Sequence, residues 1–89
     1  MKAGKPVAGS ISKSMEKAAV IQRQMTRERE RHQNKVASLA AQHAIVVRVA
    51  DPALRAAKII KLRCDETEEN QRHRAKLSEL ERRAREVWR

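Results

Sequence analysis

The position of the helix-breaking residues constrains this chain more than any other feature of its sequence. Both glycines and one of the two prolines lie within the first nine residues, and the rest of the chain contains a single break, at Asp51-Pro52. Asp is a preferred N-cap, Pro is favoured at the first helical position, and the residue before a proline is disfavoured in helical geometry. The sequence therefore predicts an all-α chain, with an extended basic arm over residues 1–13, a long helix over 14–50 and a second long helix over 51–89.

The composition predicts that these helices have no independent globular core. Seven Val, five Ile and five Leu are the large aliphatic residues among 89, and the chain has no Phe, no Tyr and one Trp. With a formal net charge of +10, this is typical of chains that bury too little apolar surface to order themselves. We expect one non-globular unit that is not a stable monomer alone. The helices could fold back as a hairpin or stay open at Asp51-Pro52.

Both predicted helices carry the alternating 3,4 spacing of a coiled-coil seam. Residues 26–35 contain no apolar side chain, which predicts that this stretch crosses solvent or lies on a charged partner surface. The acidic run 65–69 interrupts the second seam, and we expect a solvated face there with pairs such as Glu68 with Arg72. The predicted seam positions are Met15, Ala18, Gln22, Met25, Arg29, His32, Val36, Leu39, His43, Val46 and Ala50, and then His73, Leu77, Leu80, Ala84 and Val87.

The sequence offers no pattern for catalysis or for holding a cofactor. Its three histidines are not spaced as metal ligands, and no glycine follows Gly9 to build a phosphate loop. We expect no enzyme, no cofactor and no metal. The longest apolar runs, such as residues 44–47, have only four residues and are too short to cross a membrane. Cys64 is the only cysteine and cannot form an internal disulfide, which favours a reducing compartment such as the cytoplasm.

The positive charge favours a polyanionic partner, which can be nucleic acid, an anionic membrane or an acidic protein surface. We expect no membrane partner, because membrane-surface binding needs bulky apolar residues opposite the basic face and neither helix has an aromatic residue there except Trp88. A small ribosomal protein, mitochondrial or cytosolic, that contacts rRNA is the alternative reading, because such proteins use basic arms and long helices without a core. The acidic run 65–69 opposes that alternative. The electrostatic contacts that we expect are Lys2, Lys5 and Lys13 in the arm, then Arg23, Arg27, Arg29 and Arg31. The expected apolar anchors are Leu54, Ile59, Ile60, Leu62, Leu77, Leu80 and the lone Trp88.

Within residues 54–80, an Arg is followed by two leucine-like residues three apart and by a Glu four residues later: Arg55, Ile59, Leu62 and Glu66. This spacing resembles a recurring pattern in small cilia- and flagella-associated proteins that line the lumen of axonemal doublet microtubules. Position 70 is Asn where that pattern has an aromatic residue. The resemblance implies a non-enzymatic microtubule inner protein that binds tubulin and other inner proteins in the axoneme of a cilium or flagellum.

Overall fold

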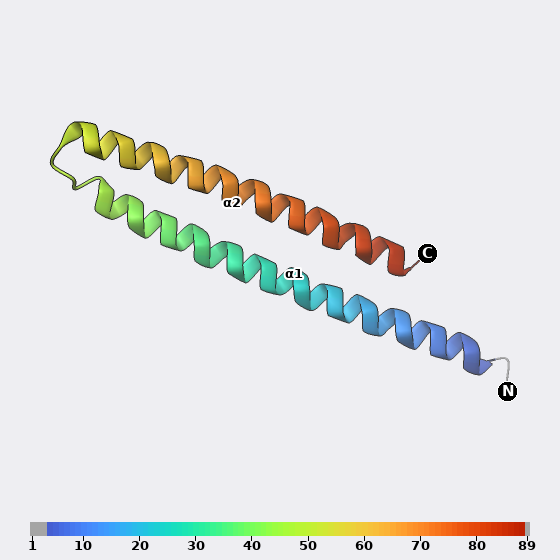
Figure 1. The fold of residues 1–89 in the computed structure, drawn as a ribbon. Helices are drawn as coiled ribbons and strands as arrows, with labels where there is room; N and C mark the ends of the chain where they lie inside the picture. The colour runs from blue at the N-terminus through green and yellow to red at the C-terminus, as the bar shows by residue number, and fades with distance from the viewer. Residues whose placement is uncertain (1–3, 89) are drawn as a thin grey trace.

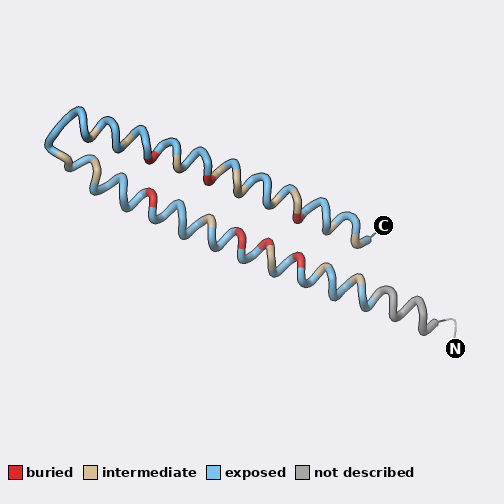
Figure 2. Tube along the Cα trace, viewed as in Figure 1, coloured by how far each residue is buried: buried red, intermediate tan, exposed pale blue. Residues whose placement is uncertain are grey.

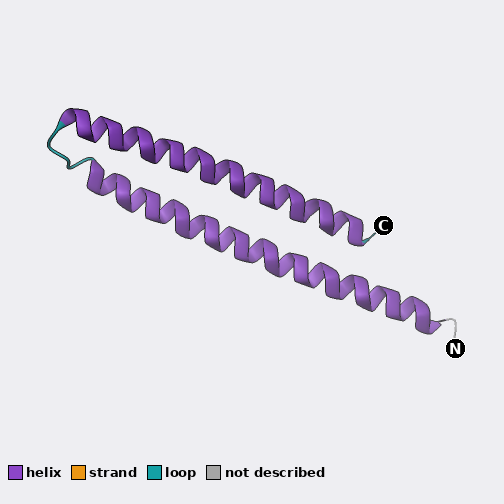
Figure 3. Ribbon diagram, in the orientation of Figure 1, coloured by secondary structure: helices purple, strands orange, loops and turns teal. Residues whose placement is uncertain are grey.

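The computed structural model describes the backbone of residues 4–88 and the side chains of residues 12–88. It contains two helices, α1 (Gly4–Val46) and α2 (Pro52–Val87), which run antiparallel and are joined by residues 47–51 (Figure 1). No strand occurs among the described residues (Figure 3). The all-α prediction is confirmed, and the open question is settled in favour of a hairpin. The molecule extends 77 × 17 × 8 Å, so it is a single layer of two helices, and α1 accounts for about 65 Å of the length.

The N-terminal segment differs from its prediction. We expected an extended arm over residues 1–13, but α1 begins at Gly4. Pro6 is the third residue of the helix, and the first four N–H groups of a helix have no intrahelical acceptor, so the missing N–H of a proline loses no bond there. The prediction was wrong because it treated Gly4, Pro6 and Gly9 as breaks, and α1 includes all three. Lys2 lies outside the described residues, and Lys5 lies outside the described side chains.

The corner between the helices is built as the sequence predicts. Asp51 caps α2, and its Oδ1 accepts hydrogen bonds from the backbone N of Ala53 at 2.9 Å and of Leu54 at 3.4 Å. Pro52 follows as the first helical residue. At the other side of the corner α1 ends at Val46, four residues before the predicted end, because its last turn tightens: the N of Arg48 donates to the carbonyl of Ile45 at 3.1 Å.

The interior is a thin line of side chains between the two helices. Leu80 is fully buried and packs with the buried Ile21 and Met25 towards the open end of the hairpin. Nearer the loop, the buried Leu39 and Leu62 line one shallow groove. Buried residues are sparse along both helices in Figure 2, and most of the described surface is exposed. The prediction of no globular core is confirmed.

Candidate functional site

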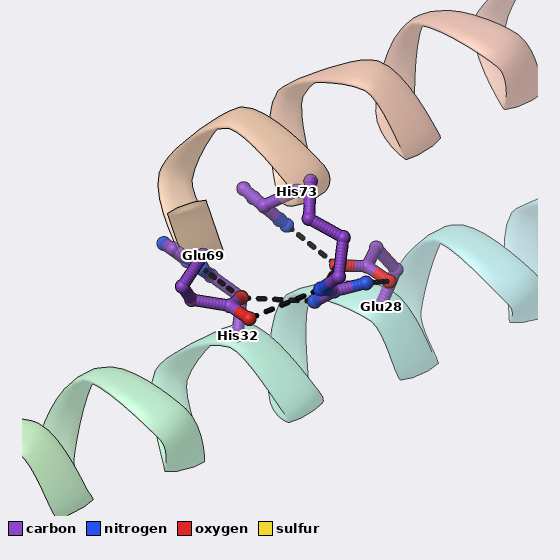
Figure 4. A network of polar contacts seen from close by, with 5 residues as sticks. Glu28, His32, Glu69 and His73 are labelled. Atoms are coloured by element: carbon purple, nitrogen blue, oxygen red, sulfur yellow. Dashed lines mark hydrogen bonds and ion pairs between the residues drawn. The ribbon is translucent and has the colours of Figure 1, made fainter. Parts of the chain in front are cut away.

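A polar network occupies the interface midway between the two apolar patches (Figure 4). Arg72 of α2 lies between two carboxylates, Glu28 from α1 and Glu69 from α2. Its two terminal nitrogens donate to both oxygens of Glu28 at 3.0 and 2.9 Å. Its Nε and one terminal nitrogen donate to Glu69 at 3.0 and 2.9 Å. One guanidinium therefore makes a bidentate bond to each helix and joins them.

Two histidines complete the network. Nδ1 of His32 lies 2.9 Å from Oε2 of Glu69, and Nδ1 of His73 lies 2.7 Å from Oε2 of Glu28. An ionised carboxylate only accepts hydrogen bonds, so Nδ1 carries the proton in both rings. The imidazoles stack, with centroids 3.8 Å apart and planes 6° from parallel. Each helix thus contributes a Glu-x-x-Arg-His segment to an almost two-fold arrangement. Arg31, the counterpart of Arg72 on α1, is exposed and forms no ion pair with any described residue.

The electrostatics of the network follow from its hydrogen bonds. The hydrogen bonds of Arg72 hold the pKa of Glu69 at about 2, and they outweigh the opposing effect of burial. Arg72 also lowers the pKa of Glu28, with His73 as a further donor. Bonds from Glu69 and then Glu28 raise the pKa of Arg72. Both carboxylates are therefore ionised at neutral pH, although their side chains are only 6% and 8% exposed.

The buried side-chain polar atoms of this region have hydrogen-bond partners. Among the described residues, no buried side-chain nitrogen or oxygen lacks a hydrogen-bond partner. A buried charge network of this kind contributes little net stability, but it penalises any arrangement that separates its members. The network therefore fixes the register of the hairpin, with Glu28 facing His73 and His32 facing Glu69. At this register the end of α2 faces residues near 14, and the first turns of α1 extend beyond α2 (Figure 1).

The network corrects what we expected of residues 26–35. That stretch was predicted to cross solvent or to lie on a partner, but Glu28 and His32 face α2 instead. The expected pair of Glu68 with Arg72 is also replaced, because the glutamate that binds Arg72 is Glu69. Apolar content was the wrong criterion, since a fully hydrogen-bonded set of charges can fill a helix interface. The repeated Glu-x-x-x-His spacing is the signal that could have identified it.

The seam of α1 was predicted in part. Met25 and Leu39 are buried, as expected, and His32 is half-buried. Every second predicted position, however, is exposed, namely Met15, Gln22, Arg29, Val36, His43 and Ala50. Ile21 and Glu28 are buried in place of Gln22 and Arg29. Residues 18, 25 and 32, which recur every seven positions, belong to both the predicted and the observed seam. After residues 18 and 25, the prediction placed the next seam residue four positions later, whereas the packing uses the residue three positions later.

The residues expected to meet a partner divide into two groups. Leu80 is fully buried and Leu62 is buried against α1, so the prediction that they anchor a partner is wrong. Ile59 and Leu77 are half-buried in the same interface. The sequence placed all four on apolar stripes of the second helix but could not tell that these stripes face α1. The expected contacts that are exposed in the structure are Lys13, Arg23, Arg27, Arg29, Arg31, Leu54, Ile60 and Trp88.

Comparisons with protein-family models, with curated proteins and with solved structures found no match to this chain. Among the described residues, no group of three or more His, Cys, Asp or Glu side chains is arranged to hold a metal ion. Neither helix, over the part of the chain that the structure describes, is long and apolar enough to span a bilayer. The features that remain for a functional argument are the exposed charges and the few large apolar side chains on the surface.

Proposed function

We propose that the protein is a non-enzymatic structural subunit that docks along an acidic protein surface in a large assembly. The observation that carries this proposal is that the polar network pairs two carboxylates with one arginine at the helix interface. Glu28, Glu69 and Arg72 together carry −1 at the helix interface, so the rest of the chain carries a formal +11. The two paired carboxylates therefore do not offset the other cations, and such a basic chain attracts polyanions.

The shape of the molecule supports a docking role over an enzymatic one. The hairpin is 77 Å long and only two helices wide, which gives a large surface for its mass. Large apolar side chains are exposed at separate points along it: Leu54 at 47%, Ile60 at 62% and Trp88 at 60%. Separated apolar points on a charged rod suit several small contacts to a lattice better than one compact interface.

The wall of an axonemal doublet microtubule is the assembly that we propose. It rests on the resemblance of residues 54–80 and on the match between a basic rod and an acidic lattice. Two residues of the resembling pattern have a role inside the hairpin: Arg55 donates to the carbonyl of Val49 at 3.1 Å, and Leu62 packs against α1. In this proposal Arg55 and Leu62 of the pattern stabilise the hairpin, and the exposed basic and apolar residues bind tubulin.

Ribosomal RNA is the second candidate partner. Arg27, Arg31 and Lys76 line one shallow groove together with Glu28, whose carboxylate is already bound by Arg72 and His73. Three cations around a groove with no free carboxylate also suit phosphate groups. The absence of aromatic side chains other than Trp88 leaves no platforms for base stacking, so this reading is limited to contacts with the RNA backbone.

Fractionation of the source cells tests the proposal and separates the two candidates. The chain would be followed by mass spectrometry through salt-washed, detergent-extracted axonemes and through ribosome pellets, each with and without nuclease. We expect enrichment in axonemes that nuclease does not change. Enrichment with ribosomes, lost on nuclease treatment, would refute the microtubule reading and favour rRNA.

A further inference from the structure

An unusual row of arginines runs along the exposed side of α1. Arg23, Arg27 and Arg31 follow one another at intervals of four residues, and all three are exposed. We call these three residues the arginine ladder. Residues four apart on a helix are neighbours on its surface, and each step rises about 6 Å along the axis. The ladder is therefore a nearly straight strip of positive charge about 12 Å long.

The ladder is not neutralised within the hairpin. No ion pair among the described residues involves any of its three arginines. Glu30 lies one turn from Arg27 but forms no ion pair with it, and the carboxylate of Glu28 is bound by Arg72 and His73. Like charges four residues apart destabilise a helix, so the ladder weakens the isolated hairpin. A bound anion would remove that cost.

The neighbouring helix adds a further cation beside the ladder. Lys76 of α2 lines the same groove as Arg27 and Arg31, and its own pairing with Glu79 is long, at 3.7 Å, and exposed. Arginine presents a planar fork that binds a carboxylate with two parallel hydrogen bonds. The strip therefore offers spaced, bidentate carboxylate sites along one edge of the hairpin.

We propose that the arginine ladder is a docking surface for an acidic α-helix of the partner protein. Carboxylates at every fourth residue of a helix recur at the same interval of about 6 Å, so such a helix could lie along α1 and pair with each arginine in turn. This inference deepens the proposed function and rests on it, because it names the residues and the partner element of the docking.

A protein helix fits the ladder better than a nucleic acid does. The chain has no Phe and no Tyr, and Trp88 does not line the grooves beside the ladder. Single-stranded RNA binding uses stacking platforms, which this surface therefore lacks. The acidic residues 65–69 of a second copy carry charge of the same sign as an acidic helix, and the test below distinguishes binding to a second copy by its effect on oligomeric state.

The test uses the full chain and two helical peptides of about 20 residues with the same composition. One peptide carries four glutamates at successive intervals of four residues, and the other distributes the same glutamates around its helix. Binding would be measured by fluorescence anisotropy for the wild type, for R23Q/R27Q/R31Q and for R63Q/R74Q/R85Q. The second triple is the matched control, because it removes three exposed arginines of α2 that make no ion pair among the described residues.

We expect the first peptide, here called the striped peptide because its glutamates form one row, to bind the wild type about tenfold more tightly than its isomer. Its affinity should fall about tenfold for R23Q/R27Q/R31Q, the ladder triple, and less than about threefold for R63Q/R74Q/R85Q, the control triple. Circular dichroism should show the ladder triple at least as helical as the wild type, because a mutual repulsion has been removed. Equal losses in both triples, or equal binding of both peptides, would refute the ladder as a site.

Two further outcomes would assign the ladder to another partner. Ladder-dependent binding of a single-stranded RNA oligonucleotide, tighter than that of the striped peptide, would replace the acidic helix with RNA. Ladder-dependent dimerisation of the chain in analytical ultracentrifugation would replace it with a second copy. The proposed function can be refuted independently of the ladder. If the striped peptide binds but the chain is absent from axonemes, the ladder is a docking surface for an acidic helix and the axonemal assignment is refuted.

Discussion

Replacing Arg72 by methionine tests the central claim about the interface, namely that one guanidinium compensates two buried carboxylates. Methionine has a similar helix propensity and length, so the substitution removes charge and four hydrogen bonds with little other change. Breaking a buried ion pair from one side costs about 3–5 kcal/mol. The Arg72 side chain is 37% exposed, so screening by water reduces the expected loss to about 2–3 kcal/mol.

The measurement is urea unfolding followed by circular dichroism at 222 nm and neutral pH, with trimethylamine N-oxide added equally to all variants to give a folded baseline. Arg82→Met is the control, because the pair of Arg82 with Glu86 is exposed at 57% and 50% and should cost at most about 0.5 kcal/mol. The triple variant E28Q/E69Q/R72M should recover part of the loss, since it also removes the uncompensated charges. An Arg72→Met variant within about 0.5 kcal/mol of the wild type would refute the reasoning, and a triple variant as unstable as Arg72→Met would assign the loss to packing.

Four other perturbations have definite expected outcomes. Leu80→Ala should lower the free energy of unfolding by about 2–3 kcal/mol, because Leu80 is fully buried, whereas Leu54→Ala at an exposed site should change it by less than about 0.5 kcal/mol; urea titration compares the two. Asp51→Ala removes the cap of α2 and should cost about 1 kcal/mol in the same assay, and a neutral result would show that the corner does not depend on the cap. The folded pKa of Glu69, about 2, lies below its ordinary value of 4.5, so its contribution to stability is present above pH 4.5 and should be lost as pH falls towards 2; thermal melts between these values should show falling midpoints, and Glu69→Gln should flatten that fall. Trp88→Ala should leave the melting midpoint nearly unchanged, because Trp88 is 60% exposed, and should weaken incorporation into axonemes by about 2 kcal/mol; unchanged incorporation would mean that Trp88 is not an anchor.

The elements of the fold were predictable because their signals are local. Asp51 and Pro52 act through capping and backbone geometry within one turn, so the start of α2 could be read from two adjacent residues. The end of α1 and the helical state of residues 4–13 depend on weaker preferences. There a proline within the first turn was mistaken for a break.

The packing between the helices was less predictable, because it depends on which residues of one helix meet which residues of the other. Glu28 looks like a surface residue until Arg72 and His73 are placed against it, and neither helix alone supplies that information. Leu62 and Leu80 look equally suited to a partner protein and to α1. Once the antiparallel pairing is known, the same residues have one consistent role, which is to close the hairpin.

The near two-fold symmetry of the network raises the question of why α1 does not pair with α1 of another molecule. Antiparallel α1·α1 pairing would place Glu28 of each copy opposite His32 of the other, with Arg31 at the position that Arg72 holds in the hairpin. Pairing of α2 with α2 would bring together two copies each of Glu69, Arg72 and His73. The network therefore supplies the same residue types to all three pairings. The short link over residues 47–51 favours pairing within one chain, because it holds the two helices at a high effective concentration.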